Sequence, residues 1–441
     1  MLFTPPAQVQ EAPALPPTLP GIQAPQRPDQ AQGVVALDLA KALDLARSEN
    51  PMILAARARV DERRGLITAT RADALPQVTL SADTGRSRDT TFMGLAPYFG
   101  VSPESMAAPH THYAAQASLS QPLYYWGKLG TAIDIAKMGE TEAGYSYTTT
   151  ELEVLHGVAK AYIAVLSAQA ELEVVEARQK TAEQFLEDVK SKLEAQTATE
   201  LDRLRAESEY LAVVPETLQT EANVKRALEV LNGQLGLDPK TPLGLSDLGR
   251  PDVGQKPQGV ERSEIAQYKQ QEEMYKANDR IIKSDLRPKF DLNASYGSQT
   301  GQADALFDNL YDVWKVGVTM RFPIFDGLRS SGKRAQNRAQ LEQVRQLRLD
   351  KERAIAVEKS SAERELQKSI AYHEAAQRAH DAGLEALRTS RESFEQGLIT
   401  SLDLLQAERT ERQLESQRRR AELGIWNALF DYRRSIGLPP L

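Results

Sequence analysis

The sequence of 441 residues contains no cysteine, which excludes disulfide bonds, thiolate zinc sites and a lipidated N-terminal cysteine in the chain as given. No stretch approaches the roughly 18 consecutive apolar residues that a transmembrane helix needs. Basic residues are not in excess, with 54 Lys and Arg against 61 Asp and Glu, so no nucleic-acid partner is expected. The chain is therefore expected to be soluble or to cross a membrane as β-strands, whose sequence signal is weaker.

Motifs for catalysis are also missing. The sequence has no phosphate-binding glycine loop, no Gly-x-Ser-x-Gly and no His-Glu-x-x-His, so we expect neither an enzyme nor a cofactor. His110 and His112 form the one close histidine pair, and a solvated loop is favoured there over a metal site. The arginine-rich run at 417–426 is interpreted as a solvated helix face.

The first residues give little that could fold. Residues 1–33 hold eight prolines and are expected to form an irregular tail. The start, MLFTPPAQVQ, has no basic residue before Arg27 and no extended apolar core, so it does not have the pattern of an intact secretory signal. Lipidation is excluded only if Met1 is the true start.

Beyond residue 33, one pattern of segments occurs twice. Each half has a helical segment, a short strand-like segment, a loop, a second strand-like segment, a very long helical segment and a further helix. Three pairs of anchors are each 201 residues apart: Pro122 and Pro323, Asp202 and Asp403, and Gly236 and Gly437. We predict a first repeat at 34–238, a linker at 239–260 and a second repeat at 261–441.

The strand-like segments lie at 75–85, 113–128, 287–297 and 314–327, and their apolar residues alternate with polar ones. Trp314, Val316 and Val318 point one way, while Lys315 and Gly317 point the other. Alternation alone favours a half-buried soluble sheet, although roughly 9–11 residues also suffice for a tilted strand to cross a bilayer.

The long helical segments make a half-buried soluble sheet less favoured. From residue 128 to 193, apolar residues recur in the narrow stripe of a coiled coil, and the rod would be on the order of 100 Å long. A strand hairpin between such rods cannot form a compact core with them, and its open edges must pair with something. Four strands are too few to close a barrel alone, so several copies of the chain are expected to share one.

Two junctions join strand to helix, QPLYYWGK and FPIFDGLR. Pro122 and Pro323 cannot donate to a sheet ladder and are expected to end their strands, with Gly127 and Gly327 beginning the helices. The aromatic residues around them would suit a membrane–water interface or would plug the top of a helical bundle: Tyr124, Tyr125, Trp126, Trp314 and Phe325.

Two Thr-x-x-Asp motifs predict capping boxes. Thr199 is expected to cap the helix that contains Asp202, and Thr400 the helix that contains Asp403. Gly397 suits the left-handed turn before the second of these helices. If the chain oligomerises around an axis, these helix starts would form a ring of carboxylates, which would be a cation-selective constriction.

In their order, these motifs resemble the TolC-like outer-membrane efflux and secretion channels, also called outer membrane factors. The resemblance covers nearly everything from residue 35 onward and rests on ALDLARSENP, LPQVTLSADTG, RPKFDLNASYG, QPLYYWG, FPIFDG, GLITSLDLLQAE and SIGLPP. It implies an α+β membrane protein with an internal two-fold repeat. A long coiled-coil α-helical barrel would extend into the periplasm, and a trimeric transmembrane β-barrel with four strands per protomer would lie in the outer membrane.

The resemblance also implies a function and partners. The chain would be a passive exit duct in the outer membrane, gated at its periplasmic tip. It would act as a homotrimer with outer-membrane lipid around it, a periplasmic adaptor protein, and an inner-membrane pump of the RND, ABC or MFS type. The alternatives are a periplasmic adaptor or a soluble coiled-coil scaffold.

Gate residues are carried over position by position. Asp403 matches the acidic residue that narrows the opening in the family, and Asp202 is its counterpart in the first repeat. Where some members have a second acidic residue, and an Arg and a Tyr as gate links, this chain has Gln406, Ile399 and Phe394. The polar gate chemistry therefore does not transfer, and an apolar latch is expected.

Overall fold

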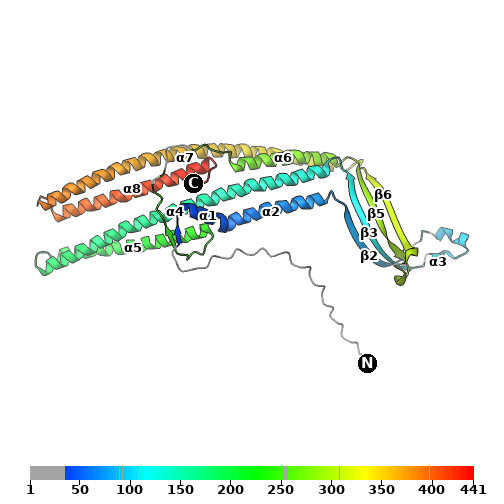
Figure 1. Cartoon of the computed structure of the whole chain (residues 1–441), viewed down its shortest axis with the longest axis horizontal. Helices are drawn as coiled ribbons and strands as arrows, with labels where there is room; N and C mark the ends of the chain where they lie inside the picture. Colours follow the sequence, from blue (N-terminus) through cyan, green and yellow to red (C-terminus); the bar gives the residue numbers. More distant parts are fainter. Residues whose placement is uncertain are drawn as a thin grey trace, which may run out of the picture.

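The computed structural model describes residues 35–88, 90–91, 93–106, 108–249, 251, 257–306, 308–396 and 398–441. The expected tail at 1–33 lies outside these residues. The molecule is elongated, with long helices leading from a sheet at one end to two helical turns at the other (Figure 1). The fold is thus mostly helical with one substantial sheet, as predicted.

The first helical segment is split in two by Asn50 and Pro51. Helix α1 spans Leu39–Glu49 and helix α2 spans Pro51–Ala72. Asn50 has an extended backbone, as the residue before a proline prefers. Its side-chain oxygen accepts a hydrogen bond from the amide of Met52 at 2.8 Å, which caps α2. The sequence predicts one helical segment before the first strand, and the structure has two helices there.

Two helical hairpins make up most of the length. Helix α4 (Lys128–Glu194) is followed by α5 (Glu200–Leu235), and α7 (Arg329–Glu395) is followed by α8 (Ser401–Ser435). Helices α4 and α7 have the same length, 67 residues. Helix α6 (Ser263–Ser284) leads into the sheet beside α4 and α7. Both hairpin turns lie at the end of the molecule farthest from the sheet (Figure 1).

The main sheet has the strand order β2-β3-β5-β6 and is antiparallel throughout. Its strands span Gln77–Ser87, His110–Tyr124, Lys289–Thr300 and Asp312–Arg321. Between β2 and β3 lie the short helices η1 (Met93–Phe99) and α3 (Pro103–Met106), and between β5 and β6 lie η2 (Ala303–Ala305) and η3 (Asn309–Tyr311).

Strand β3 does not end at Pro122. It continues to Tyr124, with a register irregularity between Pro122 and Tyr124 where Pro122 pairs with Asp291 of β5. A bulge lets a proline sit in a strand because the missing N–H falls where the ladder is already interrupted. The expectation that Pro122 ends its strand is therefore wrong by two residues, whereas β6 ends at Arg321, two residues before Pro323.

The largest cluster of buried hydrophobic residues lies in the middle of the molecule, around Tyr162 of α4 (Figure 1). Tyr162 is completely buried, and its one hydroxyl proton is shared between the carbonyls of Leu37 and Ser246, whose oxygens lie 2.9 and 2.6 Å from the hydroxyl oxygen. Leu37 ends strand β1 (Val35–Leu37), which pairs in parallel with β4 (Leu243–Leu245). This core joins the start of the chain to the segment between the two hairpins.

Hydrophobic residues at the expected spacing on α4 are buried, including Leu155, Val158, Val165, Leu186 and Val189. Within the described part of the chain, no helix combines the length and the apolar character that crossing a membrane requires.

Candidate functional site

The main sheet has one apolar and one polar face. The register aligns Val78, Leu119, Ala294 and Val316 in one row across all four strands. The neighbouring row on the other face contains Thr79, Ser118, Ser295 and Lys315. The apolar face is not covered by the helices, since Val78, Leu80, Trp314 and Val316 are 63–81% exposed. The alternation read from the sequence is confirmed, but the apolar side does not face a core within the chain.

Both edges of this sheet are open. Among the described residues, β2 pairs only with β3 and β6 pairs only with β5. An edge strand with unpaired backbone groups tends to pair with another chain. The sheet therefore offers two edges and one apolar face for which the described residues supply no partner.

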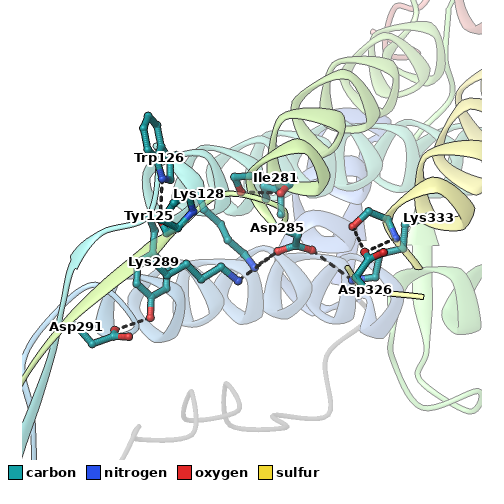
Figure 2. A network of polar contacts seen from close by, with 12 residues as sticks. Tyr125, Trp126, Lys128, Ile281, Asp285, Lys289, Asp291, Asp326 and Lys333 are labelled. Atoms are coloured by element: carbon teal, nitrogen blue, oxygen red, sulfur yellow. Dashed lines mark hydrogen bonds and ion pairs between the residues drawn. The ribbon is translucent and has the colours of Figure 1, made fainter. Parts of the chain in front are cut away.

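The junction between strands and helices is held by a polar network (Figure 2). Asp285, just after α6, lies at its centre, with ammonium groups at 2.6 Å from Lys128, 3.7 Å from Lys289 and 3.4 Å from Lys333. Burial alone would raise the pKa of Asp285, but the three lysines outweigh it and hold that pKa below its usual value. One carboxylate thus ties α4, α7 and β5 to the end of α6.

Tyr125 belongs to this network. Its hydroxyl donates a hydrogen bond of 2.6 Å to Asp291, whose strand position is on the polar face of the sheet (Figure 2). Burial, followed by the contact with Asp291, raises the pKa of Tyr125 to about 12. The hydroxyl of Tyr125 is therefore used inside the protein, and its placement at a membrane interface stays a prediction.

The other junction aromatics lie together or are exposed. Tyr124 and Trp126 form an edge-to-face pair with ring centroids 5.0 Å apart, and Arg287 stacks on Trp126 at 5.0 Å. The indole N–H of Trp126 donates to the carbonyl of Pro288 at 2.6 Å. Trp314 and Phe325 are 72% and 78% exposed.

The chain turns from strand to helix through left-handed residues. Gly127 has φ +77° and Gly327 has φ +66°, and each has a non-glycine neighbour in the same region, Trp126 at +54° and Leu328 at +64°. Glycine adopts this conformation without a steric penalty, whereas Trp126 and Leu328 do so against their preference. The predicted role of the two glycines at the junction is thus consistent with their backbone.

At the far end, both capping boxes are present as predicted. The Thr199 backbone N–H and hydroxyl donate to the Asp202 carboxylate at 3.0 and 2.6 Å, and the Asp202 amide donates to the threonine hydroxyl oxygen at 3.3 Å. Thr400 and Asp403 have the same three distances. The threonine hydroxyl, then its backbone amide, lowers the pKa of each carboxyl, so both are charged at neutral pH.

The remaining tip residues were carried over from the family resemblance. Gln406 and Phe394 are exposed and Ile399 is half-buried. Gly397 lies outside the described residues, while its counterpart Gln196 has φ +61°, a left-handed conformation that glycine would adopt more easily. Among the described residues, no hydrogen bond or ion pair links Asp202, Asp403 or Gln406 to the opposite hairpin.

Sequence reasoning missed a row of arginines on α8. Arg419 pairs with Glu173 at 2.8 Å and Arg420 with Glu171 at 3.0 Å, both on α4. Arg412 donates to the hydroxyl of Thr181 at 2.9 Å, and Arg409 pairs with Glu209 of α5. Arg419 and Arg420 are exposed, as the interpretation of 417–426 as a solvated face predicts, but they also form surface ion pairs with α4 that it did not include. We call these four contacts the α8 arginine seam.

A groove runs along this seam between the two hairpins. It encloses an open volume of about 620 Å³ and is lined by residues of all four helices, among them Arg178, Glu209, Tyr372, Arg412 and Arg420. The signal in the sequence was a pair of glutamates, Glu171 and Glu173, in one helical segment and a row of arginines in another. Because these segments are far apart in the chain, the ion pairs between them were not predicted.

Comparisons with known proteins agree on one family. The model of the family described as "Outer membrane efflux protein" matches residues 42–237 and 260–437. The pyoverdine export outer membrane protein OpmQ of Pseudomonas putida is 24% identical over 430 residues, covering 91% of this chain and 88% of that protein. Outer membrane protein TolC of Vibrio cholerae is 23% identical over 425 residues, covering 92% and 90%.

Solved structures agree on the fold. The Campylobacter jejuni CmeC outer membrane channel superposes with a TM-score of 0.77 at 16% identity, covering 90% of this chain and 85% of that one.

Proposed function

The chain belongs to the outer membrane efflux protein family, and on this premise we propose how it assembles and where it is gated. It is an outer-membrane protein that extends into the periplasm. It acts as the exit duct of an efflux pump or a type I secretion system, and the alternatives of an adaptor or a soluble scaffold are set aside.

The proposed assembly is a homotrimer, and the observation that carries it is the open sheet. Strands β2 and β6 have free outer edges, and the apolar face between them is exposed. If β6 of one copy pairs with β2 of the next, three copies close a barrel of about twelve strands, a size that leaves room for a lumen. The apolar rows would then contact outer-membrane lipid, and the polar rows around Thr79 and Ser295 would line the lumen.

The chain itself is proposed to consist of two repeats, at 34–238 and 261–441, with the segment 239–260 between them. The equal length of α4 and α7 supports this. So does the sheet register, because Gln77 pairs with Ser120 as Lys289 pairs with Arg321, and Ser120 and Arg321 are 201 residues apart like the sequence anchors. A trimer of such chains would have six similar hairpins around one axis.

The gate is proposed to lie at the hairpin turns. Asp202 and Asp403 begin α5 and α8 at this end, are exposed or half-buried, and are charged at neutral pH. Three copies would place six carboxylates around the tip and favour cations there. Gln406, Ile399 and Phe394 would make the latch less polar. The turns near 196–201 and 397–402 are where a periplasmic adaptor would dock, and an inner-membrane pump of the RND, ABC or MFS type would supply the energy.

The test is to express the chain with an export signal, extract it in detergent and record single channels in planar bilayers. We expect a trimer whose band on a denaturing gel disappears on heating, and a low, cation-selective conductance. A monodisperse monomer in buffer without detergent, with no conductance, would contradict the assembly. Co-purification with an adaptor that depends on the tip turns would support the partner assignment.

A further inference from the structure

Strand β6 carries two basic side chains on the polar face of the sheet, Lys315 and Arg321. An even number of residues separates them, so both lie on the same side of the strand, and both are exposed. In the described part of the chain, neither forms an ion pair or a side-chain hydrogen bond. These two cations are therefore available to a group from outside the chain.

The surroundings of Lys315 on this face are neutral. Its own row across the sheet contains Thr79, Ser118 and Ser295. The two adjacent rows of the same face also carry no charge. They consist of Gln77, Ser120, Asn293 and Gly317 on one side and of Ser81, Gln116, Gly297 and Val313 on the other. Lys315 therefore presents its charge to the space in front of the sheet without a carboxylate beside it.

Arg321 lies directly opposite another basic residue. The register pairs it with Lys289 of β5, so two positive charges face each other across neighbouring strands. Lys289 has the carboxylate of Asp285 at 3.7 Å, which it shares with two other lysines (Figure 2). Like charges directly opposite each other destabilise a sheet. An anion in front of the sheet would relieve this repulsion, so the pair itself indicates a place for a negative group.

The two acidic residues on the polar face of these strands have contacts of their own. Asp291 accepts the hydrogen bond of 2.6 Å from Tyr125. Asp83 lies 3.3 Å from His112, in the half of β2 that is farther from the helices. The polar face of the four strands thus has more basic than acidic residues, and its acidic residues are not paired with those of β6.

We infer that Lys315, Arg321 and Lys289 form a basic belt inside the β-barrel of the assembled duct, which binds solutes that carry several carboxylate or phosphate groups. The inference rests on the proposed trimer, in which the polar face lines the lumen. Three copies place three sets of these cations around one axis. A solute with several negative groups contacts more than one copy at once, which strengthens its binding over that of a single carboxylate. The guanidinium of Arg321 suits both groups, because it can donate two parallel hydrogen bonds to either.

The basic belt has two levels. Lys315 and Arg321 are six residues apart, which corresponds to about 20 Å along a strand. This separation exceeds the screening length of about 8 Å at physiological ionic strength, so each level acts on a solute separately. Arg321 and Lys289 form the level next to the helices, and Lys315 forms the level farther out. An anion that leaves the helical tunnel therefore meets positive charge twice on its way through the barrel.

The charge of the basic belt is opposite to that of the proposed gate. Asp202 and Asp403 place carboxylates at the hairpin turns, whereas the sheet at the other end of the molecule presents cations. The gate therefore disfavours anions at the periplasmic entrance, and the basic belt attracts those that have passed it. Because the two charged regions lie at opposite ends, each can be reached from a different side of a membrane.

The test uses the full chain as a purified trimer in planar bilayers, with the protein added to one compartment. The helical end cannot cross the bilayer, so it stays in that compartment and the barrel opens to the other. Inositol hexakisphosphate is the probe anion and is added on the barrel side. We expect it to block the unmodified channel. The double variant Lys315→Gln/Arg321→Gln should raise the half-blocking concentration about tenfold or more, because charge-assisted contacts are lost.

Matched variants separate the basic belt from charge in general. Arg86→Gln also removes a cation from the sheet, but Arg86 lies in a row of the apolar face, so the half-blocking concentration should stay the same. Lys315→Glu should weaken the block more than Lys315→Gln does, because it places a negative charge at the same level. Arg321→Gln should not lower the temperature at which the trimer dissociates on a gel, because it removes the repulsion from Lys289.

Several results would overturn the inference. If the trimer conducts but inositol hexakisphosphate blocks neither channel from the barrel side, or blocks both equally, there is no basic belt and the proposed trimer stands. The same holds if the probe blocks only from the helical side, or if Arg86→Gln weakens the block as much as the double variant does. A lower dissociation temperature in Arg321→Gln would give Arg321 a structural role instead. A monomer without conductance would remove both the inference and the proposed assembly.

Discussion

His156 of α4 donates a hydrogen bond from Nε2 to the backbone carbonyl of Leu438, 3.0 Å away and 282 residues later in the chain. A carbonyl only accepts, so Nε2 carries the proton, and Nδ1 has no partner among the described residues. Burial is the main reason that the pKa of His156 falls to about 4, with Arg434, Asp431 and Lys160 as the nearby charges. This hydrogen bond links the segment just after α8 to α4.

This arrangement predicts acid sensitivity. The unfolded chain takes up a proton on His156 near pH 6.5 but the folded chain only near pH 4, so stability is complete above pH 6.5 and falls as the pH drops towards 4. The loss from this residue should approach about 3 kcal/mol. Denaturant unfolding in detergent between pH 7 and 4 measures it. His156→Gln can still donate to the carbonyl but has no titrating imidazole, so its free energy of unfolding should depend less on pH. An unchanged pH dependence would contradict the role given to His156.

A second prediction separates charge from capping at the tip. Asp403→Ala removes the carboxylate and is expected to lower cation selectivity in single-channel recordings, because fewer negative charges remain at the constriction. Thr400→Ala removes the hydroxyl of the same capping box but keeps the charge, so it should lower stability and leave selectivity nearly unchanged. Equal selectivity in Asp403→Ala and the unmodified channel would argue against a carboxylate ring.

Weakening the α8 arginine seam should open the duct. In the double variant Arg419→Gln/Arg420→Gln, the ion pairs from α8 to α4 are lost, and we expect a higher conductance or longer openings at low salt. The pairs are partly exposed, so the difference should shrink above about 0.5 M salt, where screening already removes them. Arg388→Gln is the control, because Arg388 pairs with Glu385 of its own helix. If Arg388→Gln raised the conductance as much, the effect would come from the lost charge in general and not from the α8 arginine seam.

The junction network gives a stability prediction. Asp285→Asn leaves Lys128, Lys289 and Lys333 close together without a counter-charge, and we expect a loss of about 2 kcal/mol in the free energy of unfolding. Asp61→Asn, which loses an exposed pair with Arg64, should change stability much less. The temperature at which the assembly dissociates on a gel provides an independent comparison, and it should fall more in Asp285→Asn than in Asp61→Asn.

Gly236 offers a backbone test. It has φ +81°, and a Cβ there would lie 2.5 Å from the backbone oxygen of Glu49. Gly236→Ala should therefore destabilise the chain by more than about 2 kcal/mol, through strain and a backbone clash that cannot relax easily. Gly233→Ala, one turn earlier in α5 and with nothing within 4 Å, should be neutral or slightly stabilising. Thermal unfolding of the two variants side by side decides between these outcomes.

Features set by neighbours in sequence were predictable. The capping boxes at Thr199 and Thr400 were recognised because cap and partner are three residues apart, and the alternation on β6 because one strand shows it alone. The residues Asn50 and Pro51 also signal the division between α1 and α2 in the local sequence. The helical pattern continues on both sides of them, so one helix was predicted.

Features set by distant residues were not predictable. Strands β1 and β4 have three residues each and gain their partner only when positions 35 and 243 meet. The same reason explains why the ion pair of Arg419 was not predicted, since Glu173 is 246 residues away. The hydrogen bond between Tyr125 and Asp291 was not predictable either, because 166 residues separate them in the chain.

The identical length of α4 and α7 limits how this chain can change. Inserting or deleting one residue in either helix would rotate everything beyond it by about 100° and shift it by about 1.5 Å along the axis. Buried positions such as Val158 would then turn outward, and the two hairpin ends would no longer finish level. Indels are therefore expected to be confined to the connection between β2 and β3, where the first half is already longer than the second. Within the rods, only paired changes that keep the whole heptad should survive selection.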